Sequence, residues 1–326
     1  MTTAGARVRV RVRVRVRVRR YVEDYFIVAS LVLLIAFFGL AADNFLSLTT
    51  LTTLLNQLPA LTVITIGMTL VLIVGGIDLS VGSVMALSAG IIGVAVAGWG
   101  LPLSVAASLG ILAGLGVGLI SGGLSSYCAL PAFIVTLGML EAARGLAYIV
   151  TGSQTVYIGA EIQYLALPLP VIGASPSLVL ALGLVVAAHY TLERTVFGRY
   201  IVAIGTNEVA ARISGITTRP YKMAVLALSG ALAGLGGLFN AAYLGAADPN
   251  AGLGLELSAI AAAVIGGTSL MGGRGSIVGA FAGVLIIAVL QNGLAQLGAS
   301  EPTKRLLTGA VIILAVLIDR WRLRHG

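Results

Sequence analysis

The stretch KMAVLALSGALAGLGGLFNAAYLGA, residues 222–246, has a single charged side chain, Lys222, at its first position. A helix needs about 20 apolar residues to cross the hydrocarbon core of a bilayer, so this stretch predicts a membrane-spanning helix. The whole chain agrees: 58% of its 326 residues are hydrophobic, 10% are charged, and the mean hydropathy is +1.05. This composition excludes an ordinary soluble enzyme and indicates a membrane protein.

Nine further apolar stretches predict, with the first, an all-α polytopic bundle of about ten transmembrane helices. The predicted spans are 25–42, 58–75, 80–98, 102–123, 129–150, 176–192, 222–246, 256–271, 276–296 and 304–318. The eighth is the weakest, because it is short and Gly266 and Gly267 interrupt it. The longest external connection, 151–175, carries one charge, and we expect it to lie over the bundle.

Basic residues predict the orientation of this bundle. Eight of the 20 lysines and arginines lie in residues 1–20, where arginine and valine alternate, and the other 12 balance the 12 acidic residues. We expect this segment to be a low-complexity cytoplasmic tail, with binding to anionic lipid as the alternative, and no part of the chain resembles a nucleic-acid module. With both termini in the cytoplasm, 17 of the 20 basic residues lie inside, and Lys304 and Arg305 are exceptions outside.

Glycines recur every fourth residue in several spans, which places them on one face of each helix and predicts close helix packing. They are Gly114, Gly118 and Gly122 in one span, Gly230 and Gly234 in another, and Gly279 and Gly283 in a third.

The loop at 193–221 contains a short helix candidate, GTNEVAARISGI, at residues 205–216. Thr206 or Asn207 can cap its first turn, Glu208 and Arg212 are spaced to pair, and Gly215 suits a left-handed stop. Val209, Ile213 and Ile216 form an apolar stripe. A helix this short needs something to pack against, so it is either a docking element for another protein or an interfacial helix lying on the membrane.

The chain carries no recognisable catalytic motif. It lacks a phosphate-binding loop with its lysine, a zinc-protease motif and a serine-nucleophile turn. Its two histidines and its single cysteine, Cys128, are too few for a metal site. We therefore interpret the chain as a non-enzymatic subunit with no cofactor of its own, and energy for transport would come from ions or from a partner.

Charges inside the predicted spans are few. Glu141 and Arg144 are spaced i,i+3 on one helix, so they can neutralise each other as a structural pair or serve a function. Asp78 lies in a break between two spans, where its side chain can cap the next helix.

Four motifs stand out along the chain: GGIDLSVGS at 75–83, FIVTLGM at 133–139, EVAARISGI at 208–216 and AVIGGTSLMGG at 263–273. Taken together, they resemble the ribose-type sugar permeases of binding-protein-dependent ABC transporters. The resemblance covers about residues 25–320 and leaves out the arginine–valine tail, and Val209 stands where the family commonly has alanine.

The resemblance implies the fold of a type II ABC importer in a bacterial inner membrane, with residues 21–326 as the permease domain. It also implies a second permease copy, an extracytoplasmic solute-binding protein, and two cytoplasmic ATPase subunits that carry ATP and magnesium. The implied contact with the ATPase comprises Gly205, Asn207, Glu208, Ala210, Ala211, Arg212 and Gly215.

Neutral polar side chains near the external span ends suit an uncharged, polyhydroxylated solute, because amides both donate and accept hydrogen bonds. They equally suit helix caps and interface anchors. These residues are Asn56, Gln57, Asn240, Tyr243, Gln291 and Asn292. The glycine-broken segments at 75–84 and 266–277 resemble each other, which adds Asp78, Thr268 and Ser269 as pathway candidates.

A monosaccharide importer is the favoured interpretation. Import of branched-chain amino acids or nucleosides, a secondary transporter or channel, and a non-transporting membrane scaffold are the alternatives.

Overall fold

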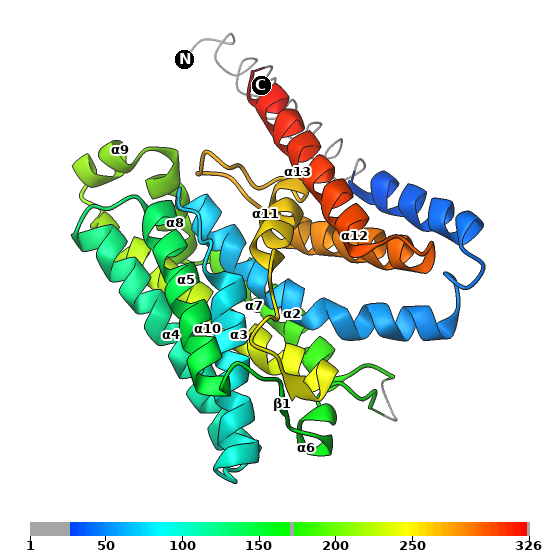
Figure 1. Ribbon diagram of the computed structural model, residues 1–326. Helices are drawn as coiled ribbons and strands as arrows, with labels where there is room; N and C mark the ends of the chain where they lie inside the picture. The colour runs from blue at the N-terminus through cyan, green and yellow to red at the C-terminus, as the bar shows by residue number, and fades with distance from the viewer. Residues whose placement is uncertain (1–26, 170–172, 325–326) are drawn as a thin grey trace.

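The computed structural model describes residues 27–169 and 173–324, so the arginine–valine tail predicted at 1–20 lies outside the described residues. The described part is an all-α bundle with one two-stranded sheet, which confirms the predicted fold class (Figure 1). After a first helix over Ile27–Ala41, the elements are α2 (Leu48–Ile73), α3 (Val81–Gly93), the π-helix η1 (Val94–Gly98), α4 (Leu103–Tyr127), α5 (Ala132–Thr151), β1 (Val156–Tyr157), α6 (Ala160–Gln163), α7 (Pro176–Arg194), α8 (Val196–Thr206), α9 (Glu208–Ile213), α10 (Thr218–Leu244), β2 (Ala246–Ala247), α11 (Leu255–Ile265), α12 (Ile277–Gln296) and α13 (Glu301–Arg324).

Seven described helices are long and apolar enough to cross a membrane: α2, α3 with η1, α4, α5, α7, α10 and α12. The eighth predicted span is wrong, because α11 has only 11 residues and rises about 16 Å. It ends where Gly266 and Gly267 begin a loop. The tenth prediction falls on α13, a longer helix that has charges at both ends and is not among the seven.

Two other differences concern helix bounds. α2 begins ten residues before the predicted span, because Ser47 caps it and Pro59 is accommodated inside it. The loop at 193–221 holds a second helix, α8, whose first turn is capped by Thr195. The sequence prediction does not include this helix, although its apolar residues, such as Phe197 and Ile201, have helical spacing.

The core forms around α10, which packs against α2, α3 and α4. The predicted glycine face is confirmed: a Cβ on Gly114 would lie 2.3 Å from the carbonyl oxygen of Gly230, and one on Gly118 would lie 2.4 Å from that of Leu226. The backbones of α4 and α10 therefore touch directly, and this contact leaves no room for side chains.

Replacing Gly118 by leucine should force α4 and α10 apart. Overpacking of this kind destabilises a protein by about 1–3 kcal/mol, so we expect a clear fall in the thermal unfolding temperature of the purified protein. Gly116→Leu on the same helix is the control, because a Cβ there meets nothing within 4 Å. Equal unfolding temperatures for the two variants would contradict the backbone contact.

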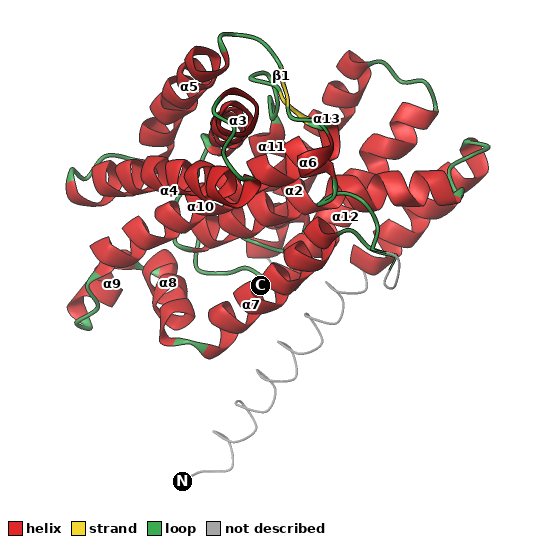
Figure 2. Ribbon diagram, turned by 90° about the horizontal axis from the view of Figure 1, so that it is seen from below, coloured by secondary structure: helices red, strands yellow, loops and turns green. Residues whose placement is uncertain are grey.

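The described residues of segment 151–175, which the sequence predicts to be external, lie over the bundle, as predicted. β1 pairs antiparallel with β2, and Ile162 of α6 is fully buried. In Figure 1, β1 and α6 lie at one end of the molecule and α9 lies at the opposite end. Figure 2 shows α5, α3 and α11 along one side and α7 and α8 along the other.

Candidate coupling surface and solute pathway

The short helix α9 has the local structure that its sequence predicts. Asn207 is its N-cap, and its Oδ1 accepts from the N–H of Ala210 at 2.9 Å. Gly215 has a φ of +86°, so it ends the helix in the left-handed region that glycine favours. Val209 and Ile213 are 65% and 83% exposed, so most of the apolar stripe points away from the chain. α9 thus presents an apolar surface on a short, capped support.

Glu208 fixes α9 to the bundle. Its Oε1 accepts from Arg212 Nη2 at 3.0 Å, the predicted i,i+4 pair, and from Thr218 Oγ1 at 2.9 Å. Its Oε2 accepts from Lys222 Nζ at 3.1 Å. Partial burial raises the pKa of Glu208, but the hydrogen bonds from Lys222 and Thr218 and the charge of Lys222 outweigh it. The net pKa lies below the usual 4.5, so the carboxylate is ionised at neutral pH.

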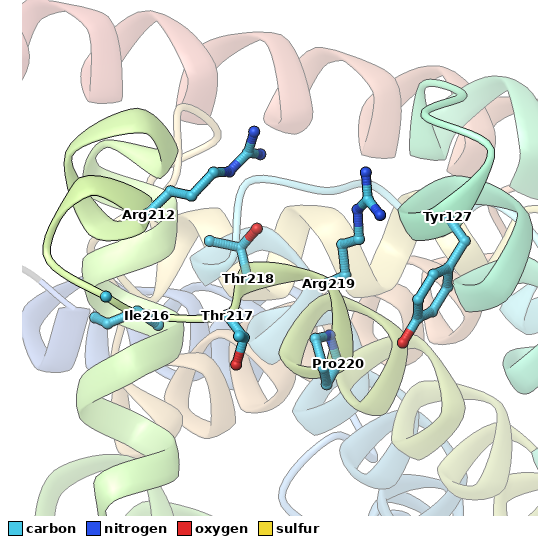
Figure 3. A pocket seen from close by; sticks show the side chains of 8 residues that line it. Tyr127, Arg212, Ile216, Thr217, Thr218, Arg219 and Pro220 are labelled. Carbon is cyan, nitrogen blue, oxygen red and sulfur yellow. The ribbon is translucent and has the colours of Figure 1, made fainter.

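A basic groove of about 380 Å³ runs beside α9. Figure 3 shows the guanidinium groups of Arg212 and Arg219 pointing to the same side of this groove. Arg219 also lies 5.9 Å from the ring centre of Tyr127, at the end of α4. The groove extends the exposed surface of α9 toward α4 and gives it a positive charge.

Most of the other predicted coupling residues are exposed, and two of them face the bundle. Asn207, Ala210, Arg212 and Gly215 are exposed, whereas Ala211 is buried against the bundle. Gly205 belongs to α8, where a Cβ would lie 1.8 Å from the carbonyl oxygen of Ile73. Gly205 thus contacts its own bundle, and its direct contact with a partner stays a prediction that the geometry does not favour.

Gly205 belongs to a junction of three segments. Its neighbours are Gly75 after α2, and Gly272 and Gly273 in the α11–α12 loop, and we call these four residues the glycine junction. The N–H of Gly273 donates to the carbonyl oxygen of Ile73 at 2.8 Å. The two glycine-broken segments that resemble each other in sequence therefore meet here, at the end of the helix that precedes α9.

Asp78 is buried near this junction and is fully hydrogen-bonded. Its Oδ1 accepts from the N–H and the hydroxyl of Ser80 at 3.0 and 2.6 Å, and its Oδ2 accepts from Ser229 Oγ at 2.8 Å. Ser80 precedes α3, so Asp78 stabilises the turn before the helix and does not cap the helix itself. Thr136 of α5 donates to the carbonyl oxygen of Ile77 at 3.0 Å and ties the same turn to a third helix. No local sequence pattern indicates Ser229 or Thr136 as partners of this turn.

A second site lies toward the opposite end of α2 and α12. A cavity of about 480 Å³ opens there between α2, α11, α12 and α13. Three of the predicted pathway residues line it: Gln57, Gln291 and Asn292. Gln57 is about 24 Å along α2 from Ile73 and the glycine junction. The sequence prediction missed Ser258, Lys304 and other lining residues, because their segments approach only in the folded chain.

The remaining pathway candidates do not line the cavity. Tyr243 lies at its edge, where its hydroxyl accepts from Gln57 Nε2 at 3.1 Å. The Oδ1 of Asn240 is buried and has no hydrogen-bond partner among the described residues, and Asn56 is half-buried. Thr268 and Ser269 are buried in the α11–α12 loop, which also forms the glycine junction. The structure thus separates these two and Asp78 from the amides.

Removing one amide from this cavity should slow transport without unfolding the protein. We expect Gln291→Ala to lower solute uptake about threefold to tenfold, which corresponds to the loss of one hydrogen bond. The control is Gln154→Ala, an exposed amide outside the cavity. Unchanged uptake in Gln57→Ala, Gln291→Ala and Asn292→Ala would exclude these residues from the pathway.

The predicted Glu141–Arg144 pair is not a direct ion pair, although the charge of Glu141 still acts favourably on the guanidinium of Arg144. Arg144 Nη1 donates to the carbonyl oxygens of Pro249 and Ala251, the latter at 2.9 Å, in the loop before α11. Backbone carbonyls attract a guanidinium without needing a second buried charge. Arg144 therefore holds this loop against α5, and Glu141 is left exposed.

Comparison with known proteins agrees with this geometry. Residues 50–316 match the family described as "Branched-chain amino acid transport system / permease component". The chain is 39% identical to the ribose import permease protein of Escherichia coli (strain K12), over 89% of this chain and 91% of that protein. It is 34% identical to the fructose import permease protein of Rhizobium meliloti, over 90% of this chain and 84% of that protein.

The xylose transport system permease protein of Haemophilus influenzae is also 34% identical, over 91% of this chain and 96% of that protein. No solved structure gives a significant match. The predicted resemblance to ribose-type sugar permeases is confirmed by these relatives. The chain is a multi-pass membrane protein and belongs to the family of transport-system permease components.

Proposed function

We propose that this chain is the permease subunit of an ATP-driven importer for a monosaccharide. Similarity over about nine tenths of the chain to ribose, fructose and xylose permeases carries the proposal. The cavity lined by Gln57, Gln291 and Asn292 supports it, because neutral amides suit the hydroxyl groups of a sugar.

The energy comes from a partner in this proposal. A cytoplasmic ATPase subunit binds the exposed apolar stripe of α9 and the basic groove beside it, and ATP and magnesium are held on that partner. The observation in favour is that Val209 and Ile213 are exposed while Glu208 fixes the helix from behind. Movement of α9 passes through α8 to the glycine junction, and from there to α2 and to the α11–α12 loop.

The cavity faces the outside of the bacterial inner membrane, where a solute-binding protein delivers the sugar, and both termini are cytoplasmic. The excess of basic residues at one side of the predicted spans supports this orientation. A second permease copy completes the transporter.

Reconstitution tests the proposal. The chain would be purified with its ATPase and placed in proteoliposomes with a binding protein, and uptake of ribose, fructose, xylose, leucine and uridine would be measured. We expect uptake of one sugar that depends on ATP and on the binding protein. Uptake of leucine or uridine alone would move the chain to another solute class, and uptake driven by an ion gradient without ATP would overturn the proposal.

A further inference from the structure

Two basic residues of the cavity lie on the side of the membrane where basic residues are uncommon. Lys304 and Arg305 lie near the end of α13 that the predicted orientation places outside, whereas lysines and arginines close to membrane spans are normally in excess on the cytoplasmic side. Both residues line the cavity of about 480 Å³, together with Gln57, Gln291 and Asn292. The exception to the orientation rule therefore coincides with the candidate solute site.

One face of α13 forms a charged wall of this cavity. Figure 1 shows α13 beside α11 and α12, and the residues of α13 that line the cavity recur with helical spacing. They are Glu301, Lys304, Arg305, Thr308, Gly309 and Ile312. The first three are charged and the last three are not, so the charges gather at one end of this wall.

The charges of this wall do not balance. Lys304 Nζ lies 3.4 Å from Glu301 Oε2, and Arg305 Nε lies 4.0 Å from Glu301 Oε1, so two cations share one carboxylate. Both distances exceed the separation of about 2.7–2.9 Å in a strong charge-assisted hydrogen bond. Among the described residues, no other acidic side chain pairs with either cation. The wall therefore keeps a net positive charge.

The opposite wall offers hydrogen-bond acceptors. Gln57 Nε2 donates to the hydroxyl of Tyr243 at 3.1 Å, and Gln291 Nε2 donates to that of Ser258 at 3.5 Å. In both amides the nitrogen is thus directed to the protein, and the oxygen is left to accept from a solute. A hydroxyl group can donate to such an oxygen, whereas an anionic group cannot. The cavity therefore has acceptors on α2 and α12 and cationic donors on α13.

We propose that this cavity binds monosaccharides that carry one anionic group, a carboxylate or a phosphate, more tightly than neutral ones. The hydroxyl groups of the sugar donate to the amides, and its anionic group accepts from Lys304 and Arg305 in place of Glu301. The side chain of Glu301 is 67% exposed and that of Lys304 only 24%, so the carboxylate can turn to solvent while the lysine stays in the wall. This inference rests on the proposed function, because it takes the cavity as the solute site.

Binding of matched sugars to the purified full chain tests this preference. D-glucose, D-glucuronate and D-glucosamine share one ring and differ in charge, and D-ribose with D-ribose 5-phosphate separates phosphate from carboxylate. We expect at least one of the two acidic sugars to bind about tenfold more tightly than its neutral counterpart, since hydrogen bonds to charged groups are strong. D-glucosamine should bind more weakly than D-glucose, and high salt should reduce both differences. Equal binding of each acidic sugar and its neutral counterpart, or no binding of either acidic sugar, would overturn the proposal.

Neutral variants of the two cations test the residues. Lys304→Gln and Arg305→Gln should each lower the affinity for the acidic sugar about tenfold and leave the affinity for its neutral counterpart unchanged, whereas Glu301→Gln should raise the affinity for the acidic sugar. Arg194→Gln is the control, because Arg194 is exposed at the end of α7 and does not line the cavity. If both variants lower the two affinities equally, the anionic group does not bind to α13 and the proposal fails.

The outcome for this site is separable from the outcome for transport. ATP-driven uptake of a sugar without any preference for acidic sugars in binding would overturn this inference and leave the proposed function intact. A preference that Lys304→Gln and Arg305→Gln abolish, in a chain that imports no sugar with ATP, would support the anion site and overturn the proposed function.

Discussion

Replacing Gly205 by alanine should lower ATP-driven uptake at least tenfold. The added Cβ would lie 1.8 Å from the carbonyl oxygen of Ile73 and 2.6 Å from the nitrogen of Gly273, and both are backbone atoms. These atoms cannot rotate away, so α8 has to move off the end of α2, and the hydrogen bond between Gly273 and Ile73 is strained or lost. The glycine junction then no longer transmits the position of α9 to the bundle.

Uptake and ATP hydrolysis would be measured on the same proteoliposomes, together with the thermal unfolding temperature. Gly183→Ala on α7 is the matched control, because that glycine is also helical and a Cβ there meets nothing within 4 Å. We expect the control to keep wild-type uptake. If Gly205→Ala also transports normally, the glycine junction does not transmit the movement of α9 to the bundle.

Replacing Glu208 by glutamine should uncouple ATP hydrolysis from uptake while leaving the protein folded. The amide nitrogen of glutamine cannot accept a hydrogen bond, so either Lys222 or the pair Thr218 and Arg212 loses its acceptor. Partly exposed ion pairs contribute only about 0.2–1 kcal/mol each, so the unfolding temperature should change little. Uptake should fall about tenfold, because α9 is no longer held in one position against the bundle.

The measured quantity is the number of ATP molecules hydrolysed per solute imported, which should rise in Glu208→Gln. Glu193→Gln is the control, because the side chain of Glu193 is 49% exposed and its carboxylate only approaches His189 Nε2, at 3.8 Å. An unchanged ratio in Glu208→Gln would show that the contacts of the Glu208 carboxylate are not needed for coupling.

The pKa of Glu208 determines how the contacts that hold α9 against the bundle depend on pH. Because the folded pKa lies below the usual 4.5, the contacts of the carboxylate stabilise the docked α9 fully above about pH 4.5. This stabilisation is lost as the pH falls through the folded pKa. The difference between the wild type and Glu208→Gln should therefore be constant at neutral pH and disappear as the pH falls below 4.5 and through the folded pKa.

Local features of the sequence predicted α9 well. The cap by Asn207, the pair of Glu208 with Arg212 and the stop at Gly215 involve residues within eight positions of each other, so spacing alone decides them. The bounds of most long helices followed from apolar length in the same way. Gly266 and Gly267 also indicated that the eighth predicted span was the weakest, and α11 ends at these glycines.

Contacts between distant segments cannot be predicted from local sequence patterns. The glycine junction joins segments near residues 75, 205 and 272, and no local pattern predicts that the backbones of these three segments meet. Arg144 was assigned to the nearest acidic residue, Glu141, whereas the fold brings it two carbonyl oxygens from residues more than 100 positions away. Three of the predicted pathway residues, Gln57, Gln291 and Asn292, do lie together at one cavity, but Ser258 and Lys304 approach them only through α11 and α13.

The backbone contact between α4 and α10 has a consequence for biosynthesis. α4 ends at Tyr127 and α10 begins at Thr218, so the ribosome adds roughly 90 residues between the two helices. At about 5–20 residues per second, the glycine face of α4 waits roughly 5–20 s for its partner. During this time lipid or an insertion factor has to cover the glycine face of α4. A slow step in translation after α4 lengthens the period in which the nascent chain is open to misassembly and proteolysis.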